Sequence, residues 1–258
     1  MSVIIGTSGW QYKDWKERFY PKTVPQKAWL EFYAERFQTV ESNNAFYMLP
    51  KKETFKSWAD RTPDDFLMAV KMNRYLTHIR RLKESAELVE RFFEHATKLG
   101  SKLGPVLLQL PPNLKTDLHS LDETLTNIKR RAPVAVEFRH ETWFTDETRS
   151  LLEQHDAALC MADRGSKAIS PFWRTTPAWT YLRFHQGAAA PWPCYGRSSL
   201  RTWAERLAAE WGPEADIWVF FNNDPGGCAL RDARIFAREV ERVGLTPTRV
   251  PRETIPVG

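Results

Sequence analysis

Eight short apolar runs divide this chain, and they constrain its fold more than any other feature of the sequence. Each run has the length of a β-strand and is almost continuously hydrophobic, as is typical of parallel strands covered on both faces. The runs occupy residues 3–8, 39–45, 66–71, 105–110, 134–139, 158–163, 179–185 and 216–222. Amphipathic helical patterns lie between them, at residues 27–37, 84–99, 117–130, 199–211 and 229–243.

This alternation of strands and helices predicts an α/β fold of the (β/α)8 TIM-barrel type with parallel strands. A length of 258 residues suits one barrel, so we expect a single domain over residues 1–258. Residues 164–178 lack a clear helical pattern, and the sixth helix is therefore expected to be degenerate. An open doubly wound sheet is the alternative, but no Gly-x-Gly-x-x-Gly motif favours it.

Composition favours a cytoplasmic protein that does not enter the membrane. No apolar run approaches the roughly 18 residues that a membrane-spanning helix needs. The first residues are typical of a strand and lack the features of a signal peptide. The three cysteines cannot all pair with one another and form no Cys-x-x-Cys motif, which suits a reducing compartment.

The net charge of +5 is only mildly basic, and part of the excess is local. Residues 71–102 hold eight Lys or Arg residues against four Glu residues. An anionic ligand or nucleic acid is one interpretation of this bias, and a solvated helix face is the other.

Polar side chains near the ends of the predicted strands indicate where a site lies. Because side chains alternate along a strand, Glu137 and Arg139 share one face, while the apolar residues between them share the other. We expect the apolar face to lie under the helices and the polar side chains to point into the barrel, where TIM-barrel active sites form. By the same reasoning the inward or rim set includes Glu41, Asn43, Lys71, Gln109, Asp163, Tyr181, Arg183, His185, Asn222 and Asn223.

The chemistry of this set has two interpretations. Glu41 and Glu137 would act as general acid and base, because two carboxylates in different environments can hold different pKa values. Alternatively, the two carboxylates and the cations Lys71, Arg139 and Arg183 form an internal ion network with no catalytic role.

Histidines follow several strands and add acid/base candidates. His140 and His185 are expected to be catalytic or to orient a substrate. With His78, Glu137 and Asp163 they could bind a divalent metal, but the sequence has neither a His-x-His nor a His-Glu-x-x-His motif. We therefore assign no metal ligands.

An aromatic segment follows the first strand and includes Trp10, Tyr12 and Trp15. Trp10 and Trp15 are expected to cover a bound substrate, and the alternative is a hydrophobic plug over the barrel mouth. The cysteines are expected to be structural.

Several motifs spread over nearly the whole chain resemble those of the YecE-like family, a domain of unknown function. They are Gly6–Trp10, Trp15 with Phe19–Pro21, Val40–Tyr47, Trp58 with Thr62, Pro63 and Phe66, Leu76–His78, Leu107–Pro112, Val136–His140 with Trp143, Tyr181–His185, and Phe221–Asp224 with Gly227. Gln186 departs from the pattern, because family members often carry glycine there. The resemblance implies a TIM-type barrel and no established activity. That barrel is loosely similar to those of xylose isomerases and apurinic endonucleases, whose full set of metal ligands this sequence does not contain.

Two functions stay open at this stage. The first is an enzyme that uses carboxylates at the strand ends on a small anionic or polyhydroxyl substrate containing a sugar or a phosphate. Hydrolase, lyase and isomerase chemistry all fit this arrangement. The second is a nucleic-acid-binding protein, possibly a nuclease-like barrel. The sequence does not indicate the oligomeric state.

Overall fold

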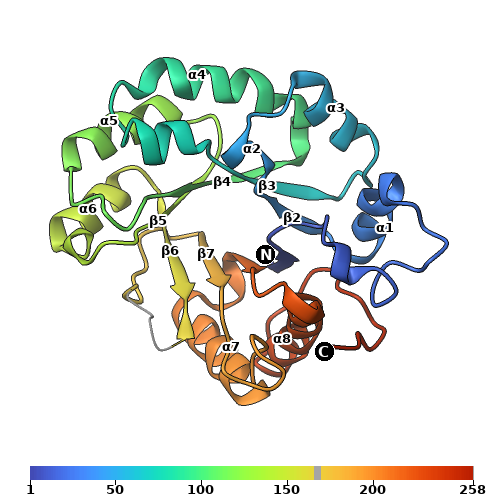
Figure 1. Cartoon of the computed structure of the whole chain (residues 1–258). Helices are drawn as coiled ribbons and strands as arrows, with labels where there is room; N and C mark the ends of the chain where they lie inside the picture. Colours follow the sequence, from blue (N-terminus) through green and yellow to red (C-terminus); the bar gives the residue numbers. More distant parts are fainter. Residues whose placement is uncertain (166–169, 258) are drawn as a thin grey trace.

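The strands of this protein form one parallel sheet that curves into a nearly closed barrel, with helices around it (Figure 1). The structure is a computed structural model and describes residues 1–165 and 170–257. The sheet has the order β1-β8-β7-β6-β5-β4-β3-β2, which confirms the predicted TIM-type barrel. The strands are β1 (Val3–Thr7), β2 (Thr39–Ser42), β3 (Leu67–Lys71), β4 (Leu103–Gln109), β5 (Val134–Glu137), β6 (Ala158–Asp163), β7 (Trp179–Phe184) and β8 (Asp216–Phe221).

Side chains of alternating parity divide the interior into two layers. On β5, Val134 and Val136 pack under the helices in the larger apolar cluster. Ala135 points into the barrel, in a smaller cluster with Trp179 and Trp218. These bulky rings and their apolar neighbours fill the lower part of the barrel, so polar groups gather at the carboxyl ends of the strands, as expected for this fold.

The barrel closes between β1 and β2 by a close approach of two backbones. A Cβ atom on Gly6 would lie 2.4 Å from the carbonyl oxygen of Thr39, so glycine is required for this contact. The Tyr33 hydroxyl joins the two strands, because it accepts a hydrogen bond from the Thr7 amide at 3.1 Å and donates one to the Thr39 carbonyl at 3.1 Å. A tyrosine side chain therefore connects the two ends of the sheet.

The predicted helices are confirmed, with boundaries that shift by a few residues. The second strand is shorter than expected, because residues from Asn44 onward turn into a short helix. The helix expected after the sixth strand was predicted to be degenerate, and residues 170–178 between β6 and β7 indeed contain no helix. Residues 166–169 of that stretch lie outside the described residues. The helices are α1 (Trp29–Arg36), α2 (Asn44–Tyr47), α3 (Lys52–Asp60), α4 (Ser85–Ala96), α5 (Leu118–Ile128), α6 (Asp146–Gln154), α7 (Arg197–Trp211) and α8 (Cys228–Arg242). Shorter helical segments include η1 (Lys13–Trp15), η3 (Tyr75–Ile79), η5 (Glu141–Trp143) and η8 (Pro225–Gly227).

Candidate active site at the barrel mouth

Four buried polar side chains meet across the inside of the barrel, and we call them the buried quartet. Arg183 of β7 donates to Glu41 of β2 at 2.8 Å and to Glu137 of β5 at 2.6 Å. The Tyr181 hydroxyl donates to the second oxygen of Glu41 at 2.7 Å. All four residues are at most 1% exposed. The quartet is Glu41, Glu137, Tyr181 and Arg183.

The geometry of the quartet keeps Glu137 ionised. Burial alone would raise the pKa of Glu137, but the Arg183 guanidinium and His185 hold that pKa well below its ordinary value. Glu137 is therefore a carboxylate that accepts ionic contacts. A carboxyl group with so low a pKa is a weak general base near neutral pH.

A second layer of polar groups lies above the quartet and is partly open to solvent. Arg139 forms an ion pair with Glu137, and His185 Nε2 lies 3.3 Å from the same carboxylate oxygen. Asn222 Nδ2 lies 2.9 Å from His185 Nδ1. If Asn222 donates this hydrogen bond, the neutral imidazole carries its proton on Nε2 and directs it toward Glu137.

Two more polar side chains connect the layers. Gln109 accepts a hydrogen bond from Arg183 at 3.4 Å, and Asn43 donates one to Glu41 at 3.4 Å.

Burial lowers the pKa of His185, and the Arg183 guanidinium lowers it further, so the imidazole is neutral at pH 7. A neutral histidine beside a carboxylate is able to transfer protons.

Two cations at the barrel opening have no acidic partner among residues 1–165 and 170–257. Lys71 ends β3, and its ammonium group lies 3.9 Å from the centre of the Phe46 ring. Arg164 directly follows β6 and is partly exposed. Burial and the nearby Arg139 guanidinium both lower the pKa of Arg164, so Arg164 lies close to Arg139. Neither Lys71 nor Arg164 forms a salt bridge with a described residue.

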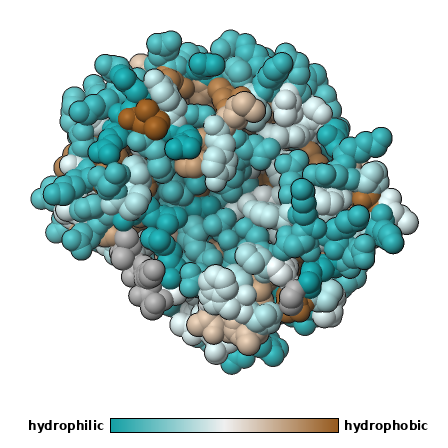
Figure 2. Space-filling view, in the orientation of Figure 1, coloured by the Kyte–Doolittle hydropathy of each residue, from teal (hydrophilic) through white to brown (hydrophobic). Residues whose placement is uncertain are grey.

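We call this opening the mouth and define it by Lys71, Arg139, Arg164, His185 and Asn222. Within the quartet and Arg139, two carboxylates balance two guanidinium groups. Lys71 and Arg164 therefore leave an excess of positive charge at the mouth. Figure 2 shows hydrophilic side chains gathered in the middle of the face seen in Figure 1, with hydrophobic ones scattered around them.

Two residues predicted from the ends of strands point away from the mouth. Asp163 accepts hydrogen bonds from the Trp203 indole at 2.6 Å and from the Gly165 amide at 2.9 Å. The inward parity of β6 runs through Cys160, so the next inward polar residue is Arg164 rather than Asp163. The prediction for Asp163 was therefore wrong by one position.

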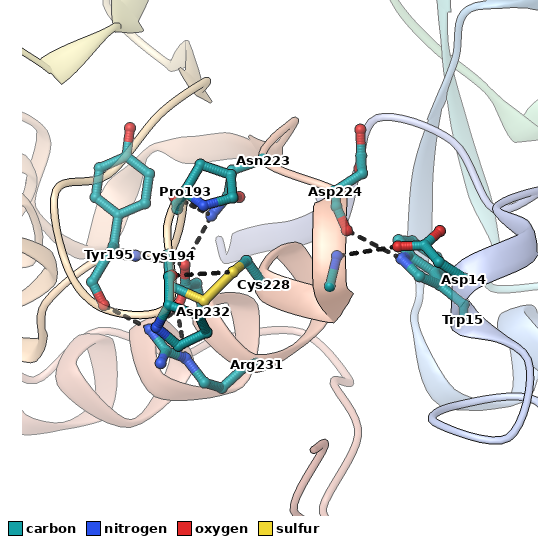
Figure 3. Close-up of a disulfide and its surroundings, with 12 residues drawn as sticks. Asp14, Trp15, Pro193, Cys194, Tyr195, Asn223, Asp224, Cys228, Arg231 and Asp232 are labelled. Atoms are coloured by element: carbon teal, nitrogen blue, oxygen red, sulfur yellow. Dashed lines mark hydrogen bonds and ion pairs between the residues drawn. A yellow bond between two sulfur atoms is a disulfide. The ribbon is translucent and has the colours of Figure 1, made fainter. Parts of the chain in front are cut away.

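The prediction for Asn223, at the end of β8, was also wrong by one position in the alternation of side chains. Its amide donates to Asp232 at 2.8 Å and to the Pro193 carbonyl at 3.2 Å (Figure 3). Asn222, by contrast, bonds to His185 and belongs to the mouth. The role of Asn223 is to hold the loop before α7 against α8.

His140 and Trp10 also lie outside the polar cluster. His140 accepts a hydrogen bond from the Thr142 amide at 3.2 Å and so caps η5. Trp10 is 2% exposed and packs edge-on against Trp58 of α3, with ring centres 5.4 Å apart. Trp15 is fully buried, and its indole donates to the Asp224 carbonyl at 3.3 Å. Neither tryptophan is exposed to contact a ligand, which contradicts the expected aromatic cover.

Asp224 is a candidate acid/base residue that the sequence analysis did not assign to the site. Burial raises the pKa of its carboxyl group to about 7, although a hydrogen bond from Tyr12 opposes the shift. One of its oxygen atoms is buried without a hydrogen-bond partner. In Figure 3 its side chain extends away from the network that holds Asn223. Alternation of side chains could have identified it, because Asp224 lies two residues beyond Asn222 and therefore on the same side of the chain.

The histidines and carboxylates do not assemble into a metal site. Within the described ranges, no group of three or more His, Cys, Asp or Glu side chains is placed to hold a metal ion. His140 and Asp163, two of the five ligands considered from the sequence, are turned away from the other three. His78 borders Lys71, and both burial and that lysine lower the pKa of His78.

A disulfide joins the loop before α7 to the first residue of α8, beside the end of β8 (Figure 3). Cys194 and Cys228 form this bond across 34 residues of sequence, and Cys160 is a free buried thiol. The expectation that the cysteines do not all pair is therefore correct. Which two cysteines would pair could not be predicted from their spacing.

Removing this disulfide is expected to destabilise the protein. A Cys194→Ala/Cys228→Ala double variant should lose about 3–4 kcal/mol of unfolding free energy, because its unfolded chain is no longer constrained by the loop. Urea titration of the variant and the oxidised wild type measures the difference. Reducing agent should lower the stability of the wild type to that of the variant and leave the variant unchanged. Equal stability of the double variant and the oxidised wild type would contradict this expectation.

Comparisons with known proteins agree on one family. Residues 4–254 match the model of the family described as "Protein of unknown function DUF72". The chain is 26% identical to the UPF0759 protein YunF of Bacillus subtilis over 96% of its length and 99% of that protein. It is 29% identical to the UPF0759 protein YecE of Escherichia coli, over 55% of its length and 50% of that protein.

Solved structures give the same result. A DUF72 family protein from Thermotoga maritima is 28% identical and superposes with a TM-score of 0.79, over 93% of this chain and 100% of that one. A DUF72 family protein from Enterococcus faecalis superposes with a TM-score of 0.79 at 20% identity, over 98% of this chain and 99% of that one. At this identity the likeness concerns only the fold. No helix in the described part of the chain is long and apolar enough to cross a membrane. The chain belongs to the DUF72 family, also named UPF0759, which includes YecE and YunF.

Proposed function

We propose that this protein is an enzyme that binds a small anionic substrate, such as a sugar phosphate, at the mouth of the barrel. The observation that carries the proposal is that Lys71 and Arg164 form no salt bridge with any residue that the structure describes, while the charges of the buried quartet and Arg139 balance one another. A charged group held near a barrel opening without a counterion attracts an anionic ligand. Arg139 and Asn222 would add hydrogen bonds to the bound anion.

The acid/base roles proposed for Glu41 and Glu137 need revision in this proposal. Both carboxylates are fully buried and bonded to Arg183, so they hold the guanidinium in place instead of meeting the substrate. Proton transfer is then assigned to His185, which is neutral at pH 7, and to Asp224, whose pKa of about 7 suits both directions of transfer. Hydrolysis, isomerisation and lyase chemistry all remain compatible with these groups.

Binding of anions tests the proposal directly. An Arg164→Gln variant is expected to bind inorganic phosphate and sugar phosphates about tenfold more weakly, because it loses one charge-assisted hydrogen bond. Isothermal titration calorimetry of the full chain measures the affinities. Arg238→Gln, which removes an exposed arginine of α8, is the matched control and should bind like the wild type. Equal binding by Arg164→Gln and the wild type, or no binding by either, would overturn the proposed site.

The nucleic-acid alternative is not carried further, because part of the basic stretch that suggested it is turned inward or paired. Lys71 points into the mouth, and Lys102 is buried against the carbonyl groups of Ala59 and Thr62. Arg80 pairs with Glu84 on the surface. Of the eight cations in residues 71–102, two are thus buried and one is paired, while Arg74, Arg81, Lys83, Arg91 and Lys98 are exposed.

We propose the cytoplasm as the compartment of this protein, as the composition suggests. The Cys194–Cys228 bond argues in the other direction, since disulfides are uncommon in reducing compartments. Cell fractionation combined with rapid thiol alkylation decides the question. Recovery of the chain outside the cytoplasm would contradict the proposal.

A further inference from the structure

Lys71 combines a buried stem with a reactive end that reaches solvent. It is the last residue of β3 and 8% exposed, on the same face as Ala69 inside the barrel. Within the described residues, its amine makes no hydrogen bond or ion pair, yet it is not among the buried polar atoms that lack a partner. Solvent therefore reaches the nitrogen. The Phe46 ring face lies 3.9 Å from the nitrogen and attracts its protonated form.

The groups that face Lys71 favour the neutral amine. Burial lowers the pKa of Lys71 to about 8, and the Arg183 guanidinium of β7 adds to the lowering, as does Arg139 beside β5. Glu41 and Glu137 act in the opposite direction, but both are bonded to guanidinium groups. His78 of η3 is neutral at pH 7, because burial and Lys71 itself lower its pKa. At pH 7, about one amine in ten is unprotonated, against roughly one in 3,000 for an ordinary lysine.

We propose that Lys71 is a covalent nucleophile that forms an imine with an aldehyde or ketone substrate bearing an anionic group. This inference rests on the proposed function, because Arg164 and Arg139 would hold the anionic group while Lys71 attacks the carbonyl carbon. Lysines that are desolvated or placed beside another cation are activated for this chemistry.

The covalent step is balanced without an oxidant or reductant. The lone pair of the amine nitrogen forms the C–N bond while the carbonyl π electrons move to oxygen. The nitrogen then gives up one proton and the oxygen takes one up, which gives a neutral carbinolamine. Expulsion of that oxygen as water, with a second proton, gives a protonated imine. In total the amine and the carbonyl compound consume one proton and release one water. The product carries one positive charge, as does the resting ammonium group, so the electrostatics of the mouth are preserved.

The groups around the mouth are suited to move these protons. Asp224, with its pKa of about 7, is able to give a proton to the departing oxygen and regain it from solvent. His185 offers a second neutral acid/base group. Imine formation would make the substrate carbon next to the former carbonyl more acidic, which suits lyase and isomerase reactions among the classes proposed above.

Reductive trapping with a defined probe tests the proposal. The full chain is incubated at pH 7 with dihydroxyacetone phosphate and sodium cyanoborohydride, and labelling is located by mass spectrometry of its peptides. Lys71 is expected to be labelled at least tenfold more than any other lysine. The Lys71→Arg variant, which keeps the charge, should lose this adduct, and Lys98→Arg, at an exposed lysine after α4, should retain it. Thermal unfolding of both variants shows whether they are folded.

A neutral probe and a phosphate titration separate the failure of this inference from that of the proposed function. Dihydroxyacetone lacks the phosphate, so it is expected to label Lys71 at least tenfold more slowly than its phosphate ester. Uniform labelling of the lysines by both probes would overturn the inference, and phosphate binding that depends on Arg164 would then leave the proposed anion site standing. Selective labelling of Lys71 at equal rates by both probes, without phosphate binding, would establish the nucleophile and overturn the anion site.

Discussion

Replacing Arg183 by methionine is expected to lower the free energy of unfolding by about 3–5 kcal/mol. The change leaves Glu41 and Glu137 buried without their shared guanidinium, and an unpaired charge in a protein interior is costly. Chemical denaturation at pH 7 measures the loss. Arg149→Met, which breaks the exposed Arg149–Glu153 pair of α6, is the matched control and should change stability by less than about 0.5 kcal/mol.

The pH dependence of this variant gives a second measure. In the wild type the pKa of Glu137 is held well below its ordinary value, so its contribution to stability is present above about pH 4.5. That contribution is lost as the pH falls through the lowered folded-state pKa. In Arg183→Met the carboxyl group of Glu137 gains less from being ionised, so the gap between the two proteins should narrow under acid. A loss below about 1 kcal/mol at pH 7 would show that the guanidinium does not hold the quartet together.

Asp224→Asn is expected to make the protein more stable at pH 8 by about 3–4 kcal/mol and to impair the proposed catalysis. Burial raises the pKa of Asp224 to about 7, from an ordinary value near 3.8, so the folded wild type binds a proton that the unfolded chain has lost. Wild-type stability should consequently fall as the pH rises from about 4 to 7. An asparagine has no charge to bury and avoids this loss.

Denaturant titrations from pH 4 to pH 8 test this expectation. The two proteins should be of similar stability at pH 4 and diverge as the pH rises, with the variant the more stable. Asp60→Asn, at an exposed position paired with Lys56, should show no such divergence. A constant difference across the range would mean that Asp224 is ionised throughout and is not the acid/base group proposed here.

The strands could be predicted well from the sequence, because parallel strands buried on both faces leave nearly continuous apolar runs. Alternation of side chains also identified the inward positions on β2, β5 and β7, where an apolar outer face defined the phase. It failed on β6 and β8. There Asp163 and Asn223 follow apolar residues on both faces, so nothing in the run distinguished inside from outside. Arg164 and Asp224 are the residues that a one-position correction recovers.

Other parts of the site depend on contacts that no local pattern reports. The burial of Trp10 against Trp58 joins β1 to α3, and the pairing of Cys194 with Cys228 joins two loops far apart in sequence. The ionisation of Asp224 depends on how closely η1 and its neighbours cover the end of β8. Such properties follow from the packing of separate elements, which the sequence specifies only through the whole fold.

The junction of β1 with β2 has a consequence for how the protein deforms. Seven neighbouring pairs of strands are joined by regular ladders, which resist shear because every amide bond would have to be exchanged. At the eighth junction no such ladder joins the two strands. The Tyr33 hydroxyl, the Asn43 amide on the Ser8 carbonyl, and residues 246–249, which bond Val3, Ile5 and Gln38, connect them instead. Changes in the circumference of the cylinder are therefore accommodated mainly on this side. Glu41 extends from the strand that borders the junction, so a ligand that pushes against it would meet the most compliant wall of the molecule.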